Sequence, residues 1–216
     1  MREDTRTLVF AAGVCLICSL LLSGASAGLK GFQEANKAFD VKRNIVKAFG
    51  YGFDIDENGK NIKWKRPQFE ETYAKHVSKE KAGELDLFIW TDAGADRPSK
   101  YAFPVSGKGL WSVLKGYLSI EADLETIAGI SFYDHKETPG LGAEIEKSWF
   151  QSQFAGKKLY SNGTITEFSV VKPGTPLTET SVDGISGATL TGKGVEALIR
   201  KDAAAYANYF KSIKGN

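Results

Sequence analysis

The feature that most limits how this chain can fold is an uncharged segment near its N-terminus. Residues 7–29 separate Arg6 from Lys30 without a charged side chain. A helix of that length crosses a bilayer core of roughly 30 Å. The segment is therefore a membrane anchor or a signal peptide, and Ala25-Ser26-Ala27 is similar to a small-residue cleavage site. Its length favours an uncleaved anchor, which we assign to residues 1–30.

Charges on the two sides of this segment leave its orientation open. Arg2 and Arg6 precede it together with Glu3 and Asp4. Five basic residues follow it, namely Lys30, Lys37, Lys42, Arg43 and Lys47. Charge counting alone keeps the following domain inside the cell, whereas a short N-terminal tail is typical of export signals, whose large domains cross regardless of charge.

The composition of the chain indicates one folded domain behind the anchor. A chain of 216 residues with 42% hydrophobic residues buries one good core. Its 28 basic and 26 acidic residues give a net charge of +2 without a long basic block, so we expect no nucleic-acid partner. Both cysteines, Cys15 and Cys18, lie in the apolar segment, where we interpret them as small hydrophobic residues.

Hydrophobic periodicity predicts an α+β domain over residues 51–216, joined to the anchor by an amphipathic helix at residues 31–50 that stops at Gly50. A turn is expected at residues 56–59 and a charged, weakly helical stretch at residues 69–81. Strand patterns follow at residues 85–90, 101–105, 110–120, 127–133 and 164–171. Consecutive strands imply an antiparallel sheet, packed by a helix at residues 142–154 and by a final helix. The apolar stripe of the final helix consists of Val195, Leu198, Ile199, Ala203, Tyr206, Phe210 and Ile213.

A glycine-rich turn precedes the final helix and has the composition of a phosphate site. It runs Asp183-Gly184-Ile185-Ser186-Gly187-Ala188-Thr189-Leu190-Thr191-Gly192-Lys193-Gly194. Its four glycines allow a tight turn with N–H groups pointing outward, and the start of the next helix adds partial positive charge. We therefore expect an anionic phosphate to bind here, beside the hydroxyl groups of Ser186, Thr189 and Thr191.

A nucleotide-hydrolase P-loop is the first alternative for this turn. Gly187, Gly192 and Lys193 fit that motif, but Gly194 stands where the magnesium-binding hydroxyl is required. Residues 178–182 do not have the pattern of a buried parallel strand, and only 22 residues follow Gly194. Further strands with a second acidic motif have no room, which argues against a hydrolase.

Two other segments combine flexible backbone with side chains able to contact a flat ligand. His135-Lys136-Glu137-Thr138-Pro139-Gly140-Leu141-Gly142-Ala143-Glu144 is a rigid polar turn, either a ligand loop or an ordinary strand-to-helix connection. Gly107-Lys108-Gly109-Leu110-Trp111-Ser112 presents a tryptophan that stacks on a ring or belongs to a core or partner interface. His76 and His135 are too scattered for a metal site, and the residues suggest no catalytic triad.

These three segments, in this order behind one N-terminal anchor, resemble the C subunits of sodium-translocating NADH:quinone reductases, a family of FMN-binding domains. The most specific likeness is Asp183-Gly184-Ile185-Ser186-Gly187-Ala188-Thr189, which is similar to the recognition sequence of a flavin transferase. The resemblance implies that this transferase joins the phosphate of FMN covalently to the hydroxyl of Thr189.

The resemblance also implies roles for the neighbouring residues. Those expected around the attachment point are Ser186, Gly187, Ala188, Leu190 and Thr191. Those expected near the flavin ring are Trp111, Glu137, Thr138, Gly140, Leu141 and Gly142. Asp183, Gly184 and Lys193 are expected to serve recognition by the transferase.

The function implied is that of an electron carrier, not catalytic alone, which relays electrons from NADH towards quinone coupled to sodium export. Its partners are then the other subunits, the membrane and the flavin transferase. Because that transferase acts outside the cytoplasmic membrane, the domain is expected to face the periplasm as a single-pass inner-membrane protein. One alternative is the G subunit of an Rnf-type electron-transport complex, although the Gly-Lys-Gly-Leu-Trp segment favours the reductase. Another is an anchored phosphate-binding or scaffold protein without flavin.

Overall fold

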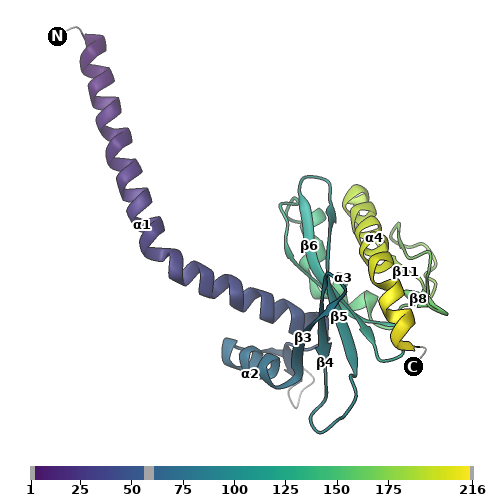
Figure 1. Cartoon of the computed structure of the whole chain (residues 1–216). Coiled ribbons are helices and arrows are strands. Elements are labelled where there is room, and N and C mark those ends of the chain that lie inside the picture. Colours follow the sequence, from purple (N-terminus) through teal and green to yellow (C-terminus); the bar gives the residue numbers. More distant parts are fainter. Residues whose placement is uncertain (1–2, 56–60, 215–216) are drawn as a thin grey trace. The chain divides into compact units, whose positions relative to one another are not determined.

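A computed structural model describes residues 3–55 and 61–214 of the chain. It contains two compact units, Met1–Asp40 and Val41–Asn216. The turn predicted at residues 56–59 lies outside the described residues. Figure 1 shows the elements along the chain, coloured from purple at the N-terminus to yellow at the C-terminus.

Helix α1 (Glu3–Ala48) is continuous, so the anchor and the linking helix that the sequence separates are one helix. Gly28 and Gly31 do not interrupt it, because an isolated glycine costs only about 1 kcal/mol relative to alanine and good helix formers flank both. It ends just before Gly50, whose φ of 94° stops a helix as predicted. The helix is long and apolar enough to cross a membrane.

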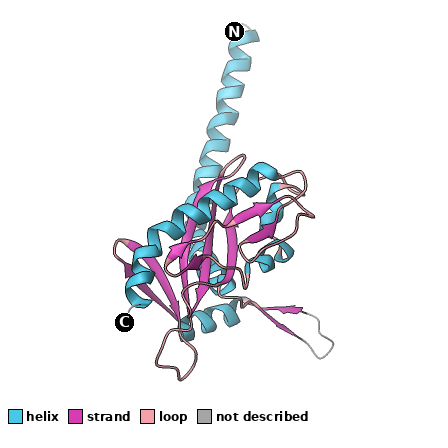
Figure 2. Cartoon of the chain, turned by 90° about the vertical axis from the view of Figure 1, so that its right-hand side faces the viewer, coloured by secondary structure: helices cyan, strands magenta, loops and turns pink. Residues whose placement is uncertain are grey.

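The domain is built on a five-stranded antiparallel sheet with the strand order β3-β4-β5-β6-β7 (Figures 1 and 2). Its strands are β3 (Val77–Ala82), β4 (Leu85–Trp90), β5 (Lys100–Lys108), β6 (Val113–Glu121) and β7 (Ile127–Asp134). The predicted antiparallel sheet is confirmed. Strand β6 begins only at Val113, because residues 110–112 form the turn after β5.

The stretch predicted as weakly helical at residues 69–81 contains two elements. Helix α2 (Arg66–His76) ends at His76, and β3 follows at once as an edge strand of the sheet. Its sequence Val-Ser-Lys-Glu-Lys-Ala has the charged side chains that protect a sheet edge. The sequence pattern missed this strand because only its first and last residues, Val77 and Ala82, pack on apolar clusters, while the four residues between them are exposed.

Alternate residues of the sheet pack on two different apolar clusters. Leu87 and Ile89 point to the cluster of helix α4 (Thr189–Lys214), while Phe88 and Trp90 point to a cluster with Ile45 and Phe49. Figures 1 and 2 show α4 lying across one face of the sheet. The stripe predicted for the final helix is confirmed, with Val195 to Phe210 buried and Ile213 partly buried.

Two sequence predictions about the connecting segments were wrong. Residues 142–154 are three short pieces, η1 (Gly142–Glu146), α3 (Ser148–Gln151) and η2 (Ser152–Phe154). Lys147 takes an extended conformation with ψ 144° and separates η1 from α3, while η2 follows α3 directly. The strand predicted at 164–171 is split into β9 (Thr164–Ile165) and β10 (Ser169–Val171).

Strand β10 pairs in parallel with β11 (Ser181–Asp183), the strand that leads into the glycine-rich turn. This corrects the expectation that no parallel strand precedes that turn. A pair of three residues is too short to leave a hydrophobic run in the sequence. The remaining short pairs are β1 (Phe53–Ile55) with β2 (Asn61–Lys63) and β8 (Tyr160–Ser161) with β9.

Candidate functional site

The three segments singled out in the sequence meet at the carboxylate of Glu137. Its Oε1 accepts hydrogen bonds from the backbone N–H groups of Trp111 at 2.9 Å and Ser112 at 3.3 Å. Its Oε2 accepts from the Leu110 N–H at 3.3 Å and from the Thr191 hydroxyl at 2.7 Å. The carboxylate thus joins the β5–β6 turn and the first turn of α4 to the segment that follows β7.

Glycines make room for this carboxylate. A Cβ at Gly109 would lie 2.7 Å from Glu137 Oε1, and a Cβ at Gly142 would lie 2.8 Å from Oε2. A Cβ at Gly194 would lie 2.5 Å from the carbonyl oxygen of Lys108, so the start of α4 also packs directly on the end of β5. These distances are shorter than any real Cβ contact, and they explain why glycine occupies all three positions.

Glu137 is ionised in this setting although its side chain is buried, with the residue only 5% exposed. Burial is the largest influence and raises the pKa of its carboxyl, but four hydrogen bonds, led by that from Thr191, together lower it below the usual value. A carboxylate that accepts several N–H and O–H groups has its charge stabilised without a cationic partner.

The glycine-rich turn presents its hydroxyl groups in different ways. Thr189 is the first residue of α4 and is exposed, and Ser186 in the loop before it is exposed as well. Thr191 is 1% exposed and donates its hydroxyl to Glu137. Between Ser186 and Thr189, Gly187 has a φ of 76°, a left-handed conformation that favours glycine, and Ala188 is buried.

Large apolar side chains stand exposed near this turn. Trp111 is 69% exposed, Leu190 62% and Leu141 41%. The side chain of Leu141 lies against Gly187, because a Cβ there would meet Leu141 Cδ2 at 2.9 Å. Large exposed apolar side chains beside such a turn offer surface on which a ligand or partner can pack.

The turn after β7 exposes the rest of the residues expected at a ring. Thr138 and Gly140 are exposed, and Gly140 has a φ of 74°. The Thr138 carbonyl accepts hydrogen bonds from the N–H groups of Leu141 and Ala143, both at 3.1 Å, which fixes the turn. Glu137 and Gly142, also expected near the ring, are buried.

The three residues expected to serve a transferase are held in the same turn. Asp183 ends β11, and its carboxylate accepts a hydrogen bond from the Gly174 N–H at 3.3 Å. Gly184 is buried and donates its N–H to the Val171 carbonyl at 2.8 Å. Lys193 is exposed and pairs with Glu196 at 3.0 Å, a surface ion pair of little energetic weight.

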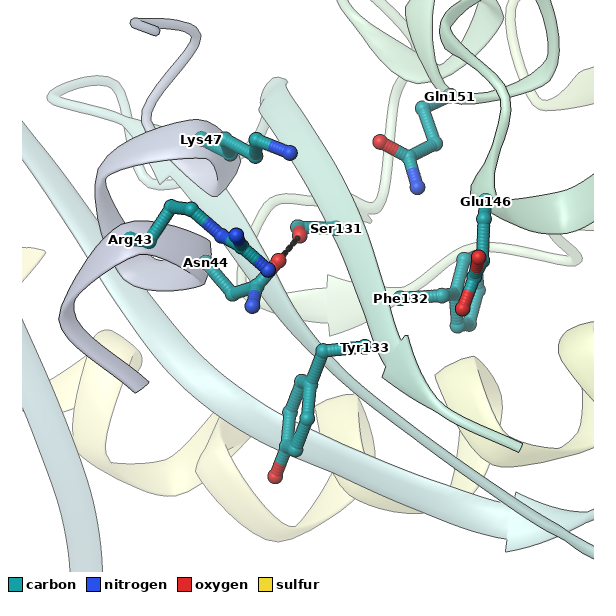
Figure 3. Close-up of a pocket in the computed structure, with 8 residues that line it drawn as sticks. All are labelled: Arg43, Asn44, Lys47, Ser131, Phe132, Tyr133, Glu146 and Gln151. Carbon is teal, nitrogen blue, oxygen red and sulfur yellow. Dashed lines mark hydrogen bonds between the residues drawn. The ribbon is translucent and has the colours of Figure 1, made fainter. Parts of the chain in front are cut away.

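A separate cavity of about 120 Å³ lies between the end of α1 and strand β7 (Figure 3). Arg43, Asn44 and Lys47 line it from the helix, and Ser131 donates a hydrogen bond to Asn44 Oδ1 at 2.8 Å. Drug-sized ligands occupy pockets of roughly 300–1,000 Å³, so this cavity is too small for a nucleotide. None of its lining residues belongs to the glycine-rich turn.

Known proteins are similar in sequence to this chain over most of its length. The C subunit of the Na(+)-translocating NADH-quinone reductase of Vibrio vulnificus is 33% identical over an alignment of 226 positions, which covers 88% of this chain and 87% of that protein. The chain belongs to this family of C subunits. The corresponding protein of Pseudomonas aeruginosa is 30% identical and covers 91% of this chain and 90% of that protein. These names favour the reductase over the Rnf-type alternative.

Members of this family with solved structures have the same fold. The crystal structure of the Parabacteroides distasonis protein matches with a TM-score of 0.71 at 30% identity, covering 84% of this chain and 96% of that one. The Shewanella oneidensis NqrC structure matches with a TM-score of 0.69 at 23% identity, a likeness of fold alone. The α+β class predicted from the sequence is confirmed.

Residues 109–203 match the FMN-binding domain family. The matched range begins at Gly109 and ends within α4, so it contains the carboxylate of Glu137 and all its hydrogen-bond donors. The chain is therefore an FMN-binding subunit of this reductase family. The residues present fit such a group, because a helix start with exposed N–H groups and hydroxyls suits a phosphate and the exposed apolar side chains suit a ring.

Sequence reasoning missed two features of this site. It did not predict that the Glu137 carboxylate accepts hydrogen bonds from the backbone of the β5–β6 turn and from Thr191. It also gave no reason for Gly109 and Gly194, whose close contacts bring β5 and α4 together. The only available signal was the presence of unexplained glycines in two segments far apart in the chain.

Proposed function

We propose that the chain carries FMN covalently through a phosphoester to Thr189 and relays electrons within a sodium-translocating NADH:quinone reductase. The observation that carries the proposal is the contrast between two threonines of the same turn. The Thr189 hydroxyl is exposed at the start of α4, while the Thr191 hydroxyl is buried and bonded to Glu137. A transferase that acts from solution can reach only the first.

The start of α4 supports attachment at this position. The first N–H groups of a helix have no partner within the helix, and a helix of 26 residues adds partial positive charge at its N-terminus. In the attachment step the Thr189 oxygen forms a bond to the phosphorus of the FMN half of a flavin dinucleotide. The phosphoanhydride bond breaks, and the nucleoside monophosphate leaves with the proton of the threonine hydroxyl. The backbone around Gly187 and Ala188 and the hydroxyl of Ser186 then lie beside the phosphate.

The exposed side chains nearby are the proposed contacts of the ring. Trp111, Leu141 and Leu190 offer apolar surface, and Thr138 and the backbone at Gly140 offer polar groups. Bound FMN supplies one-electron and two-electron redox chemistry. A covalent link suits this task, since a carrier between subunits must keep its cofactor in one place.

The proposal includes the surroundings of the chain. Helix α1 anchors it in the cytoplasmic membrane with the domain in the periplasm, where the flavin transferase meets Asp183, Gly184 and Lys193. The other subunits of the complex deliver and accept the electron. Cleavage of the domain by protease added to intact spheroplasts is the expected sign of this orientation, and protection until the membrane is lysed would contradict it.

The attachment is tested by coexpressing the full chain with a flavin transferase and analysing its peptides by mass spectrometry. The peptide containing Thr189 is expected to carry FMN less one water, and the denatured chain is expected to fluoresce on a gel. Thr189→Val removes one hydroxyl with little change of volume, so it should abolish the fluorescence and leave a folded domain.

Two control variants, Ser186→Ala and Thr191→Ser, keep Thr189 and should stay fluorescent. Flavin retained in the Thr189→Val chain would refute the assignment. A colourless wild-type chain would instead favour the scaffold alternative, and magnesium-dependent nucleotide turnover would favour the hydrolase.

A further inference from the structure

We propose that Glu137 is a positioning residue for flavin attachment and does not touch the flavin. It holds two turns in one arrangement: the first turn of α4 with Thr189 and Thr191, called the acceptor turn, and the turn at residues 110–112, called the Trp111 turn. This rests on the proposed covalent attachment at Thr189. The residue acts through its hydrogen bonds to the backbone of residues 110–112 and to Thr191.

The Glu137 carboxylate accepts four hydrogen bonds from the protein itself. Three N–H groups of one turn and one hydroxyl of another converge on its two oxygens at 2.7 to 3.3 Å. Hydrogen bonds to an ionised acceptor are roughly twice as strong as neutral ones. With the residue only 5% exposed and both oxygens accepting hydrogen bonds from the protein, the carboxylate has a structural task that needs no flavin.

The neighbouring glycines leave the carboxylate no room to move. Gly109 approaches Oε1 from one side, and Gly142 approaches Oε2 and the Thr191 hydroxyl from the other. A Cβ at Gly142 would lie 2.6 Å from the Thr191 oxygen. The glycines therefore enclose the group closely, and its orientation defines the relative position of the two turns.

Thr189, the proposed attachment residue, begins the acceptor turn at the start of α4. Thr191 stands two residues after Thr189 in the first turn of α4, where intrahelical hydrogen bonds are incomplete. Helix ends fray at low free energy unless tertiary contacts hold them. Farther along, Val195 and Leu198 are fully buried and keep the helix in place. Loss of the Glu137–Thr191 bond should consequently loosen the acceptor turn and leave the domain folded.

Glutamine at position 137 is a sharp probe of this arrangement. Its amide has one acceptor oxygen, and its NH₂ group only donates. With the oxygen kept towards Trp111 and Ser112, the NH₂ group faces the Leu110 N–H, which then has no acceptor. The Thr191 hydroxyl can turn to accept, so this bond survives in weakened form. Glu137→Gln thus disturbs the Trp111 turn most, while Thr191→Val disturbs only the acceptor turn.

The test measures the initial rate of flavin incorporation into the full chain in detergent, using purified flavin transferase and its flavin nucleotide donor. We expect Glu137→Gln to slow incorporation at least tenfold and Thr191→Val to slow it several-fold. Thr191→Ser keeps the hydroxyl and should restore most of the rate. Hydrogen exchange of the chain before attachment should show lost protection at residues 110–112 in the first variant and at residues 189–192 in both.

A matched control separates positioning from general destabilisation. Tyr160 donates its buried hydroxyl to the carbonyl of Ala203 at 2.6 Å. Ala203 lies on α4 like Thr189, but roughly 20 Å farther along the helix. Tyr160→Phe should lower the thermal midpoint without slowing incorporation. Rates equal to wild type in both Glu137→Gln and Thr191→Val would overturn the proposal, and so would equal slowing by Tyr160→Phe.

A failure of the proposed function has a different signature. In that case the wild-type chain itself takes up no flavin at Thr189, and the positioning role falls with it. If only the positioning role is wrong, the wild-type chain is modified and the variants at positions 137 and 191 are modified equally fast.

Discussion

Gly142 and Gly140 stand two residues apart, and the structure gives them different reasons to be glycine. At Gly142 the limit is space, because a Cβ would lie 2.6 Å from Thr191 Oγ1 and 2.8 Å from Glu137 Oε2. At Gly140 the limit is conformation, because φ is 74° and nothing lies within 4 Å of the added Cβ. Alanine at the two positions should therefore have unequal effects.

The magnitude for Gly142→Ala follows from the atoms it would meet. Overpacking a filled site costs about 1–3 kcal/mol. If the Glu137–Thr191 bond parts as the neighbours shift, a hydrogen bond to a charged group worth about 1.5–3 kcal/mol is lost as well. The lower unfolded-state entropy of alanine offsets about 0.4–1 kcal/mol. With that bond lost, the net loss in the free energy of unfolding is about 1.5–5.5 kcal/mol.

Gly140→Ala is the matched comparison. A left-handed alanine costs about 1–2 kcal/mol, and the same entropy term offsets part of it. The net loss is therefore about 1 kcal/mol. Gly140→Asn should lose less, since asparagine adopts this conformation more readily than alanine.

Thermal unfolding of the full chain in detergent measures these differences. Near-ultraviolet circular dichroism follows the packed aromatic side chains of the domain. At about 2–4 °C per kcal/mol for a domain of this size, Gly142→Ala should lower the midpoint by at least about 3–6 °C and Gly140→Ala by about 2–4 °C. Equal shifts, or a larger shift for Gly140→Ala, would refute the steric explanation of Gly142.

Two further predictions concern stability. The folded-state pKa of Glu137 is lowered from 4.5, so its ionised form contributes stability above about pH 4.5 that is lost as the pH falls through the folded-state value. Urea unfolding at pH 7 and at pH 3.5 should therefore show a smaller loss of stability on acidification for Glu137→Gln than for wild type. An equal loss would contradict the assignment. The Ser119 hydroxyl donates to the carbonyl of Ala48 at the end of α1 and to that of Gly129. Ser119→Ala should therefore lower the free energy of unfolding by about 1–3 kcal/mol in the same assay. A neutral effect would show that water replaces the hydroxyl.

Much of the fold could be predicted because its elements leave local patterns. The uncharged run of residues 7–29, the strand at 85–90 and the apolar stripe of the final helix each have their own periodicity, and the structure contains all three. The continuity of α1, the edge strand β3 and the parallel pair β10–β11 were missed. They depend on tolerated glycines or on partner strands, which no local window contains.

The candidate site divides in the same way. The sequence alone determined that a glycine-rich, hydroxyl-bearing turn precedes a long helix and that two further turns carry flat or flexible groups. Only the tertiary structure decided that Thr189 is exposed while Thr191 is buried, and that Glu137 faces inward. These facts depend on hydrogen bonds between residues 26 and 54 positions apart, which form only once the sheet has brought the three turns together.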